Sequence, residues 1–227
     1  GQSIPFVGDF GCQHPESIAL DEYRVYFTDK ARGAVLRLSR DGITEISNNG
    51  MDNWFDEQLE RAQSIVGSFD DSKSEYNITI HEVISPRVSK NVYTLSFDES
   101  TKGWTSFKSF IKESGLSLNN KYYTFKKGRL YRHHSDDVLR NYFYDNQYES
   151  SVTTLINMQP NIVKSFYTIN YEGSQAEIVK DLTDEKYTNI KGVSGWSVED
   201  IKTDQQEGEV DEFVEKEGKW FNNIKGK

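Results

Sequence analysis

Apolar and polar residues alternate along two stretches near the start of the chain, residues 23–29 and 33–42. In the first stretch Tyr23, Val25 and Phe27 fall on one side, as in a strand with one buried face. The second stretch ends in Asp41 and Gly42, a pair that tolerates the positive φ angles of tight turns. The pattern predicts a hairpin of antiparallel strands joined by a short polar loop.

The spacing of apolar residues changes to that of a helix after Gly50. Between residues 51 and 66 the large apolar side chains fall near one stripe: Met51, Trp54, Phe55, Leu59, Ala62, Ile65 and Val66. This spacing predicts one amphipathic helix over residues 51–66, packed across the end of a sheet. We assign it a structural role only.

Strand patterns return after residue 67. Alternating or β-branched runs cover residues 76–80, 92–97, 104–107, 122–125, 129–132, 151–156 and 162–171. Turn-forming residues such as Gly103 and Gly128 separate neighbouring runs. We therefore expect adjacent hairpins to build an antiparallel β domain over residues 67–180.

The composition changes again in the last part of the chain, residues 181–227. Residues 203–212 are acidic and nearly free of large apolar side chains, which indicates an exposed, extended segment rather than a core strand. Trp196, Trp220 and Phe221 flank it as expected anchors. Such a segment is suited to docking on a neighbouring subunit, and equally to docking on its own domain.

The overall composition agrees with a mainly β protein. The chain has 13 Tyr, 13 Phe and 4 Trp but a mean hydropathy of -0.73, so its core has to rely on aromatic side chains, which favour sheets. We expect antiparallel hairpins in a propeller-like or sandwich body. Residues 1–50 would be the terminal β-hairpin, or blade, of a larger β domain.

Charge and cysteine content restrict the kinds of site. A formal net charge of -9 argues against a general nucleic-acid surface. The small basic cluster of Lys126, Lys127, Arg129 and Arg132 is a phosphate site or, more simply, a solvated strand edge. A single cysteine, Cys12, excludes an internal disulfide and a cysteine-rich zinc site.

The sequence offers no membrane-inserting segment. Its apolar runs all stay short of the roughly 20 residues that span a bilayer. The first residues lack the charged and apolar regions of a signal peptide. We therefore expect no membrane insertion.

Histidines near carboxylates are the best metal candidates. His133 and His134 are followed by Asp136 and Asp137, but adjacent strand residues point to opposite faces, so the two imidazoles would not converge on one ion. Cys12 and His14 could be a nucleophilic thiol and its base. Their spacing in the sequence does not show that the two side chains meet, and a cysteine with a purely structural role is the simpler interpretation. We predict no metal site.

Two acidic loops have a composition that calcium sites share. They contain Asp70, Asp71, Ser72 and Glu75 in one case and Asp181, Asp184 and Glu185 in the other. Neither follows the residue order of the helix-loop-helix calcium site, so we expect turns with solvated carboxylates. Residues 77–79 match a glycosylation sequon, but they lie within a predicted strand.

Enzyme motifs are missing from the sequence. It contains no HExxH, P-loop, GxGxxG or GxSxG phrase. Paired carboxylates for glycoside cleavage can be drawn freely among 36 acidic residues, so such a choice carries no information. We predict no catalytic residues, no cofactor and no enzymatic activity.

The order of short phrases is more informative than any one of them. The phrases occupy residues 26–29, 33–47, 68–77, 95–107, 123–131, 170–173 and 216–221. Together they resemble the C-terminal part of tail structural proteins of short-tailed bacteriophages, most closely the muzzle protein family of crAss-like phages. The resemblance runs over nearly the whole chain.

This resemblance implies an architectural role in the virion tail, after synthesis in the cytoplasm of the bacterial host. It implies a ring of copies around the tail axis that forms the distal conduit for genome ejection and contacts the host. The implied partners are other copies, neighbouring tail proteins and the absent N-terminal part of the same polypeptide. DNA would pass transiently, and an acidic wall would keep it from sticking.

The residues leave other functions open. Residues 26–29 also resemble a phrase of β-propellers, so a propeller-type module that binds a protein or a glycan is an alternative, although it needs further blades. A tail-associated depolymerase would need a cleft with convergent carboxylates of perturbed pKa. We expect Gly1 to mark a proteolytic maturation site or an artificial boundary, with the hairpin of residues 23–46 pairing to the absent portion.

Overall fold

A computed structural model of the chain describes residues 8–82, 91–176, 178–179, 189–190, 195–210 and 213–226. The chain divides into two compact units, residues 1–152 and residues 153–227. No helix in the described ranges is long and apolar enough to cross a membrane. The prediction of a mainly β protein with antiparallel hairpins and one helix is confirmed.

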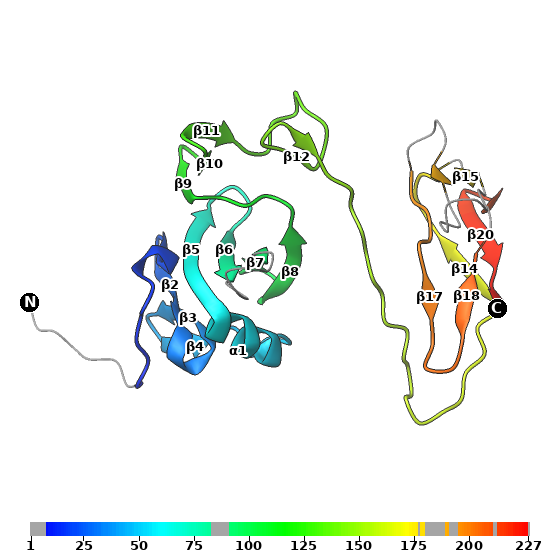
Figure 1. Cartoon of the computed structure of the whole chain (residues 1–227), viewed down its shortest axis with the longest axis horizontal. Helices are drawn as coiled ribbons and strands as arrows, with labels where there is room; N and C mark the ends of the chain where they lie inside the picture. Colours follow the sequence, from blue (N-terminus) through cyan, green and yellow to red (C-terminus); the bar gives the residue numbers. More distant parts are fainter. Residues whose placement is uncertain are drawn as a thin grey trace, which may run out of the picture. The chain divides into compact units, whose positions relative to one another are not determined.

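Unit 1 begins with a four-stranded antiparallel sheet. After a 3-10 turn, η1 (Pro15–Ser17), its strands follow in chain order: β1 (Ala19–Asp21), β2 (Arg24–Asp29), β3 (Ala34–Ser39) and β4 (Gly42–Glu45) (Figure 1). The predicted hairpin is β2–β3, in which Val25 pairs with Leu38. Its connection is a second 3-10 turn, η2 (Lys30–Arg32), which ends at Gly33 with φ 64°. Both sequence-predicted strands are confirmed, but the predicted buried face is wrong: Tyr26 and Thr28 are fully buried in β2, whereas Tyr23 is 73% exposed.

A second four-stranded sheet repeats the same strand order. It consists of β5 (Ala62–Asp70), β6 (Glu75–Glu82), β7 (Val92–Asp98) and β8 (Gly103–Lys108), each antiparallel to the next (Figure 1). The strands predicted at residues 76–80, 92–97 and 104–107 are therefore confirmed. The sequence pattern indicated a single hairpin or blade in residues 1–50, whereas unit 1 contains two four-stranded sheets of the same strand order.

The helix α1 runs from Asp52 to Arg61 and lies against β3, β6 and η2. The prediction that it continues to residue 66 was wrong. Ala62 adopts an extended backbone with φ -62° and ψ 129°, and the following residues form the start of β5, where Ile65 pairs with Ile80. Strand pairing and the β-branched Ile65 and Val66 outweigh a helical spacing that both structures can satisfy.

The two sheets and α1 share one hydrophobic core. Aromatic rings hold it together: the Tyr26 ring stacks on Tyr76 at 4.8 Å and on Phe69 at 5.5 Å between centroids. Phe55 from α1 packs against Trp104 at 4.5 Å. Because Tyr26 comes from the first sheet and its two stacking partners from the second, ring stacking joins the sheets directly.

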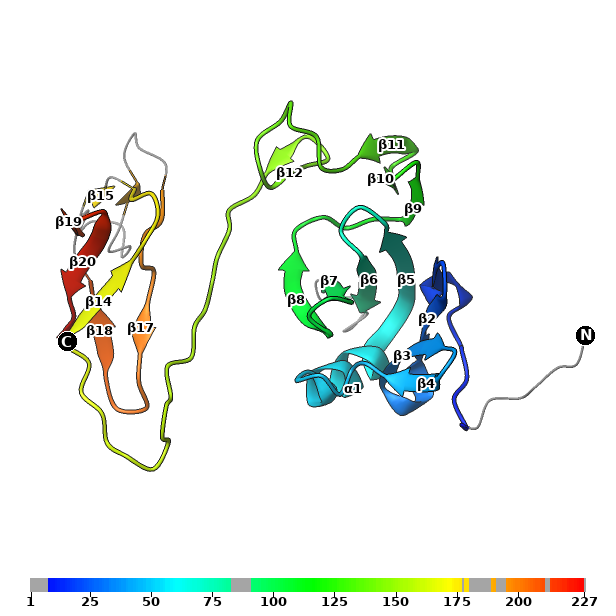
Figure 2. The ribbon, with the colours of Figure 1, turned by 180° about the vertical axis from the view of Figure 1, so that it is seen from behind.

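A third sheet covers the end of β5. It contains β9 (Ser114–Leu118), β10 (Lys121–Lys126) and β11 (Arg129–Arg132), with β10 in the centre (Figure 2). Its inner face is anchored by Tyr122, whose hydroxyl lies 2.7 Å from the Ser68 hydroxyl, and by Ser117, whose hydroxyl donates to the Phe69 carbonyl at 2.9 Å. A short hairpin follows, β12 (Tyr142–Phe143) and β13 (Asn146–Gln147).

Unit 2 consists of short antiparallel strands. One sheet has the order β14 (Thr168–Tyr171), β20 (Lys219–Asn223), β19 (Val214–Lys216), and another the order β17 (Ile201–Lys202), β18 (Glu207–Glu209), β21 (Lys225–Gly226). The strands β15 (Ile178–Val179) and β16 (Asn189–Ile190) form a pair. The acidic stretch of residues 203–212, predicted as an exposed, extended segment rather than a core strand, thus contributes the turn and second strand of the β17–β18 hairpin.

The expected strands at residues 151–156 and 162–171 are mostly absent. Only residues 168–171 form a strand, β14, whereas residues 151–167 belong to no strand. Their β-branched and aromatic composition favours strands, but a strand requires a pairing partner. The described part of this chain supplies none for residues 151–166.

Candidate functional site

His133 and His134 follow the end of β11 rather than lying on a strand, and their ring centroids are 6.1 Å apart. His133 is buried, and its Nε2 lies 2.7 Å from the Thr124 hydroxyl. Burial, aided by the charge of His134, lowers the pKa of His133 to about 4. His134 turns away with φ 56°, and its Nε2 lies 2.6 Å from Oδ2 of Asp70. Among the described residues no group of three or more His, Cys, Asp or Glu side chains could hold a metal ion.

An open hollow of about 420 Å³ lies beside His134. It is lined by Ser72, Lys73, Asn120, Lys121, Tyr122, Arg132, His133, His134, Ser135, Asp136 and Asp137. Burial acts to raise the pKa of Asp70, but hydrogen bonds from His134 and Ser72 outweigh it, and the pKa is lowered. The hollow is therefore lined by both basic and acidic side chains, and His134 in its lining is paired with Asp70.

The other sequence candidates have structural partners. The Cys12 Sγ contacts the backbone carbonyl of His14 at 3.4 Å, not its imidazole. Glu75 pairs with Lys108 at 3.3 Å. Asn77 is buried in the central strand β6, where its Oδ1 accepts a hydrogen bond from Ser96, so the glycosylation sequon is covered. The second acidic loop, Asp181, Asp184 and Glu185, lies outside the described residues.

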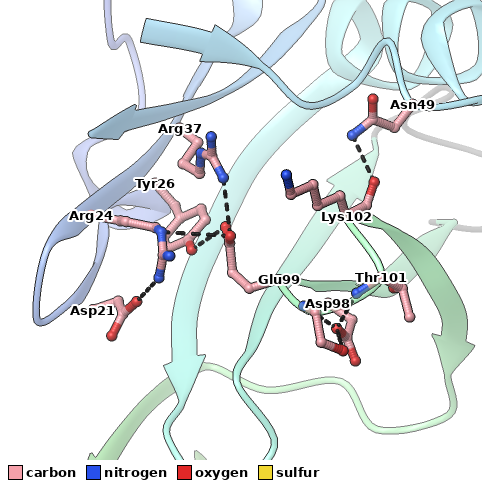
Figure 3. Close-up of polar contacts among 10 residues, drawn as sticks. Asp21, Arg24, Tyr26, Arg37, Asn49, Asp98, Glu99, Thr101 and Lys102 are labelled. Carbon is pink, nitrogen blue, oxygen red and sulfur yellow. Dashed lines mark hydrogen bonds and ion pairs between the residues drawn. The ribbon is translucent and has the colours of Figure 1, made fainter. Parts of the chain in front are cut away.

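Glu99 is the centre of a polar network that sequence reasoning missed. It lies in the β7–β8 turn and reaches the first sheet (Figure 3). Its carboxylate accepts a hydrogen bond from the Tyr26 hydroxyl at 2.5 Å and from Arg37 at 3.0 Å. Arg24 lies 3.5 Å away and is itself bonded to Asp21 at 2.7 Å. One carboxylate thus links β2 and β3 to the turn of the other sheet.

We expect Glu99→Gln to lower the free energy of unfolding by roughly 1–2 kcal/mol. The amide keeps an acceptor for Tyr26, but it loses the charge that holds Arg37, and hydrogen bonds to charged groups contribute most. Urea denaturation measures the change. Glu57→Gln on the exposed side of α1 is the matched control. An unchanged midpoint in both variants would show that the network contributes no stability.

Lys112 is a second residue whose role the sequence pattern did not indicate. It lies in the segment of the chain that connects β8 to β9, and its side chain is completely buried. Its Nζ donates to the Asn77 carbonyl and to the Thr79 hydroxyl of β6, both at 3.0 Å. Burial lowers its pKa to about 7. Neither acceptor is a carboxylate or an electrophilic group. The arrangement therefore holds a proton near neutral pH but provides no substrate-facing chemistry.

The third sheet exposes an apolar face, which we term the outer face. Strand register places five large apolar or aromatic side chains on it, Leu116, Leu118, Tyr123, Phe125 and Leu130, together with the charged side chains of Lys121 and Arg132. Leu118 is 62% exposed and Leu130 is 57% exposed. Besides Lys121 and Arg132 on the face itself, further basic residues lie nearby in β10, β11 and their turn: Lys126, Lys127 and Arg129.

A second exposed apolar surface is the segment of residues 152–167, which we term the arm. Its large apolar side chains are exposed: Val152, Leu155, Ile156, Met158, Ile162, Val163, Phe166 and Tyr167. Leu155 is 91% and Val163 is 97% exposed. Isolated apolar residues on a surface are ordinary, but a run of this kind marks an interaction segment.

Comparison with known proteins assigns the C-terminal part. Residues 139–227 match the family model of the crassvirus muzzle protein C-terminal domain. A search of curated proteins gives no match. The resemblance to the muzzle family of crAss-like phages is thereby confirmed for these residues, and a muzzle domain implies a structural role in the phage virion.

Proposed function

Starting from the crassvirus muzzle protein C-terminal domain in residues 139–227, we propose that this chain is a structural subunit of a phage tail. The match to that family carries the proposal. The described geometry supports it, since His134 beside the hollow is bonded to Asp70, and Glu99 is bonded to Tyr26 and Arg37. The large exposed features are apolar surfaces, which suit assembly.

The finer proposal is a ring of copies around the tail axis that forms the distal conduit for genome ejection. Rings arise when one patch on a subunit binds a different patch on the next, and the rotation closes. The outer face and the arm are two such different patches. A net charge of -9 suits a conduit wall, because like charge keeps DNA from adhering.

The conduit proposal includes contact with the host at the distal end and contact with neighbouring tail proteins. Both follow from the position that a muzzle would occupy. An acidic inner wall is part of the same proposal. A solved tail assembly whose inner wall is basic, or is formed by another protein, would contradict it.

Labelling of intact phage particles tests the structural role. Antibodies against this chain, visualised by electron microscopy, are expected to bind at the free end of the tail. Mass spectrometry of purified virions should recover its peptides at a copy number that matches a ring. Labelling of the capsid alone, or peptides found only in the cell lysate, would overturn the proposal.

A further inference from the structure

We propose that the arm of one copy docks on the outer face of a second copy. This inference rests on the proposed tail function only in assuming that many copies meet. In this interaction, residues 152–167 of one molecule cover the outer face of another molecule of the same chain. The contact is head-to-tail, because it joins two different surfaces.

The outer face has the properties of a covered surface. Five large side chains from three strands lie together, and register places them on one side of the sheet. The opposite side is fully engaged, with Tyr122 and Thr124 buried against neighbouring groups. A β-sheet that packs on one face normally exposes polar side chains on the other. Leucines at positions 116, 118 and 130 depart from that rule.

The arm has the properties of a segment that is covered from two sides. Its apolar residues occur as adjacent pairs, Leu155 with Ile156, Ile162 with Val163, and Phe166 with Tyr167. Adjacent residues of an extended chain point in opposite directions, so both sides of the arm are apolar. Its single charged side chain, Lys164, turns back to the arm's own backbone and donates to the Gln159 carbonyl at 2.7 Å. These bonds satisfy part of the ammonium group, and the other side chains of the arm are uncharged.

Charge favours the same pairing. The outer face carries Lys121 and Arg132, and Lys127 and Arg129 lie nearby in the β10–β11 hairpin. Exposed carboxylates follow the arm in the chain, among them Glu199, Asp204 and Glu207. Docking of the arm on a second copy brings an acidic unit toward a basic rim. Opposite charge of this kind steers association and fixes orientation.

The size of the core in unit 2 gives a further reason. Among its described residues the buried apolar side chains are Ala176, Val210 and Phe213. A unit of this length whose described residues include so few buried apolar side chains gains stability when a partner covers more apolar surface. Burying the arm against a second copy would supply that apolar area.

A complementation experiment with the full chain tests the proposal. The arm variant carries Leu155→Asp and Ile156→Asp, and the face variant carries Leu116→Asp and Leu130→Asp. Light scattering should show that the wild-type chain self-associates and that each variant associates at least about tenfold more weakly. A mixture of the two variants should recover a heterodimer, because it retains one intact arm and one intact face that can meet.

Two controls keep the result interpretable. Leu20→Asp changes an exposed apolar residue of β1 outside both surfaces and should leave association unchanged. Thermal unfolding of both variants should match the wild type, since all four altered side chains are exposed. A face variant that unfolds early is replaced by the milder Leu118→Ser, which should weaken association in the same direction.

Three results would overturn the inference. They are a monomeric wild-type chain, association that neither variant weakens, and variants that fail to complement each other. A monomer whose arm resists protease would place the arm on its own chain instead. The docking and the tail function can fail separately. If antibodies label the tail but the two variants do not complement each other, only the docking is rejected. If the variants complement each other but the antibodies do not label virions, only the tail function is rejected.

Discussion

Lys112→Met should raise the free energy of unfolding by about 3 kcal/mol at pH 6. In the wild-type chain the folded state lowers the pKa of Lys112 from 10.5 to about 7. At pH 6 the lysine is protonated in both states, so the folded state carries the full cost of a buried charge. Methionine has a similar length and removes that cost, at the loss of two hydrogen bonds.

The same lysine predicts how stability depends on pH. Between pH 7 and pH 10.5 the unfolded chain binds a proton at Lys112 that the folded chain has released. The free energy of unfolding of the wild type therefore rises with pH in this window, by about 2 kcal/mol from pH 7 to pH 9. The Met variant should lack this contribution, so the two stability curves converge as the pH rises.

Urea denaturation at pH 6, 7 and 9 measures both effects. Lys73→Met, at an exposed position of the β5–β6 turn, is the control and should leave the pH dependence unchanged. Measurements stop at pH 9 because burial raises the pKa of Tyr26, Tyr76 and Tyr122, whose titration opposes that of Lys112 only above about pH 10. A Met variant that is less stable than the wild type at pH 6 would contradict the prediction.

Gly67→Ala should destabilise unit 1 by about 3 kcal/mol or more. A Cβ atom at this position would lie 1.9 Å from the carbonyl oxygen of Ser17 and 2.6 Å from its carbonyl carbon. That carbonyl accepts the Tyr76 hydroxyl at 2.8 Å, and the Ser17 side chain bonds to Thr28 at 3.0 Å. Backbone cannot rotate aside as a side chain can, so η1 would have to move away from β5 and break these bonds.

Gly103→Ala is the matched control, because it also places a methyl group on a strand glycine. Its Cβ would have no neighbour closer than 3.8 Å, so the midpoint of thermal unfolding should stay the same or rise slightly. Equal midpoints for the two variants would mean that η1 adjusts without cost. Loss of near-ultraviolet circular dichroism in the Gly67 variant alone would support the close packing of η1.

Local patterns in the sequence were sufficient for most strands of unit 1. Alternation predicted the pair β2–β3 and the strands β6, β7 and β10, because each presents one face to a core and the other to solvent or a neighbouring sheet. The C-terminal end of α1 was missed because apolar residues at 62, 65 and 66 satisfy both a helical stripe and a buried strand. Only the pairing of β5 with β6 distinguishes the two.

Long-range contacts account for what the sequence did not reveal. The partners of Glu99 lie 62 and 73 positions away, so no local spacing marks it as the centre of a network. Lys112 is of a residue type that usually lies on the surface, and its two partners, Asn77 and Thr79, are 35 and 33 positions away in β6. For the histidines the sequence argument used strand alternation, whereas both lie beyond the end of β11 and His134 has φ 56°.

The position of Glu99 also has a consequence for the growing polypeptide during synthesis. The Tyr26 ring is enclosed by residues 69 and 76, and its hydroxyl partner follows at residue 99. When only the first sheet has been synthesised, Tyr26 has neither its ring-stacking partners nor the hydrogen bond to Glu99. Because contacts between distant residues form slowly, unit 1 should reach its native state late in translation, in one step that waits for the β7–β8 turn.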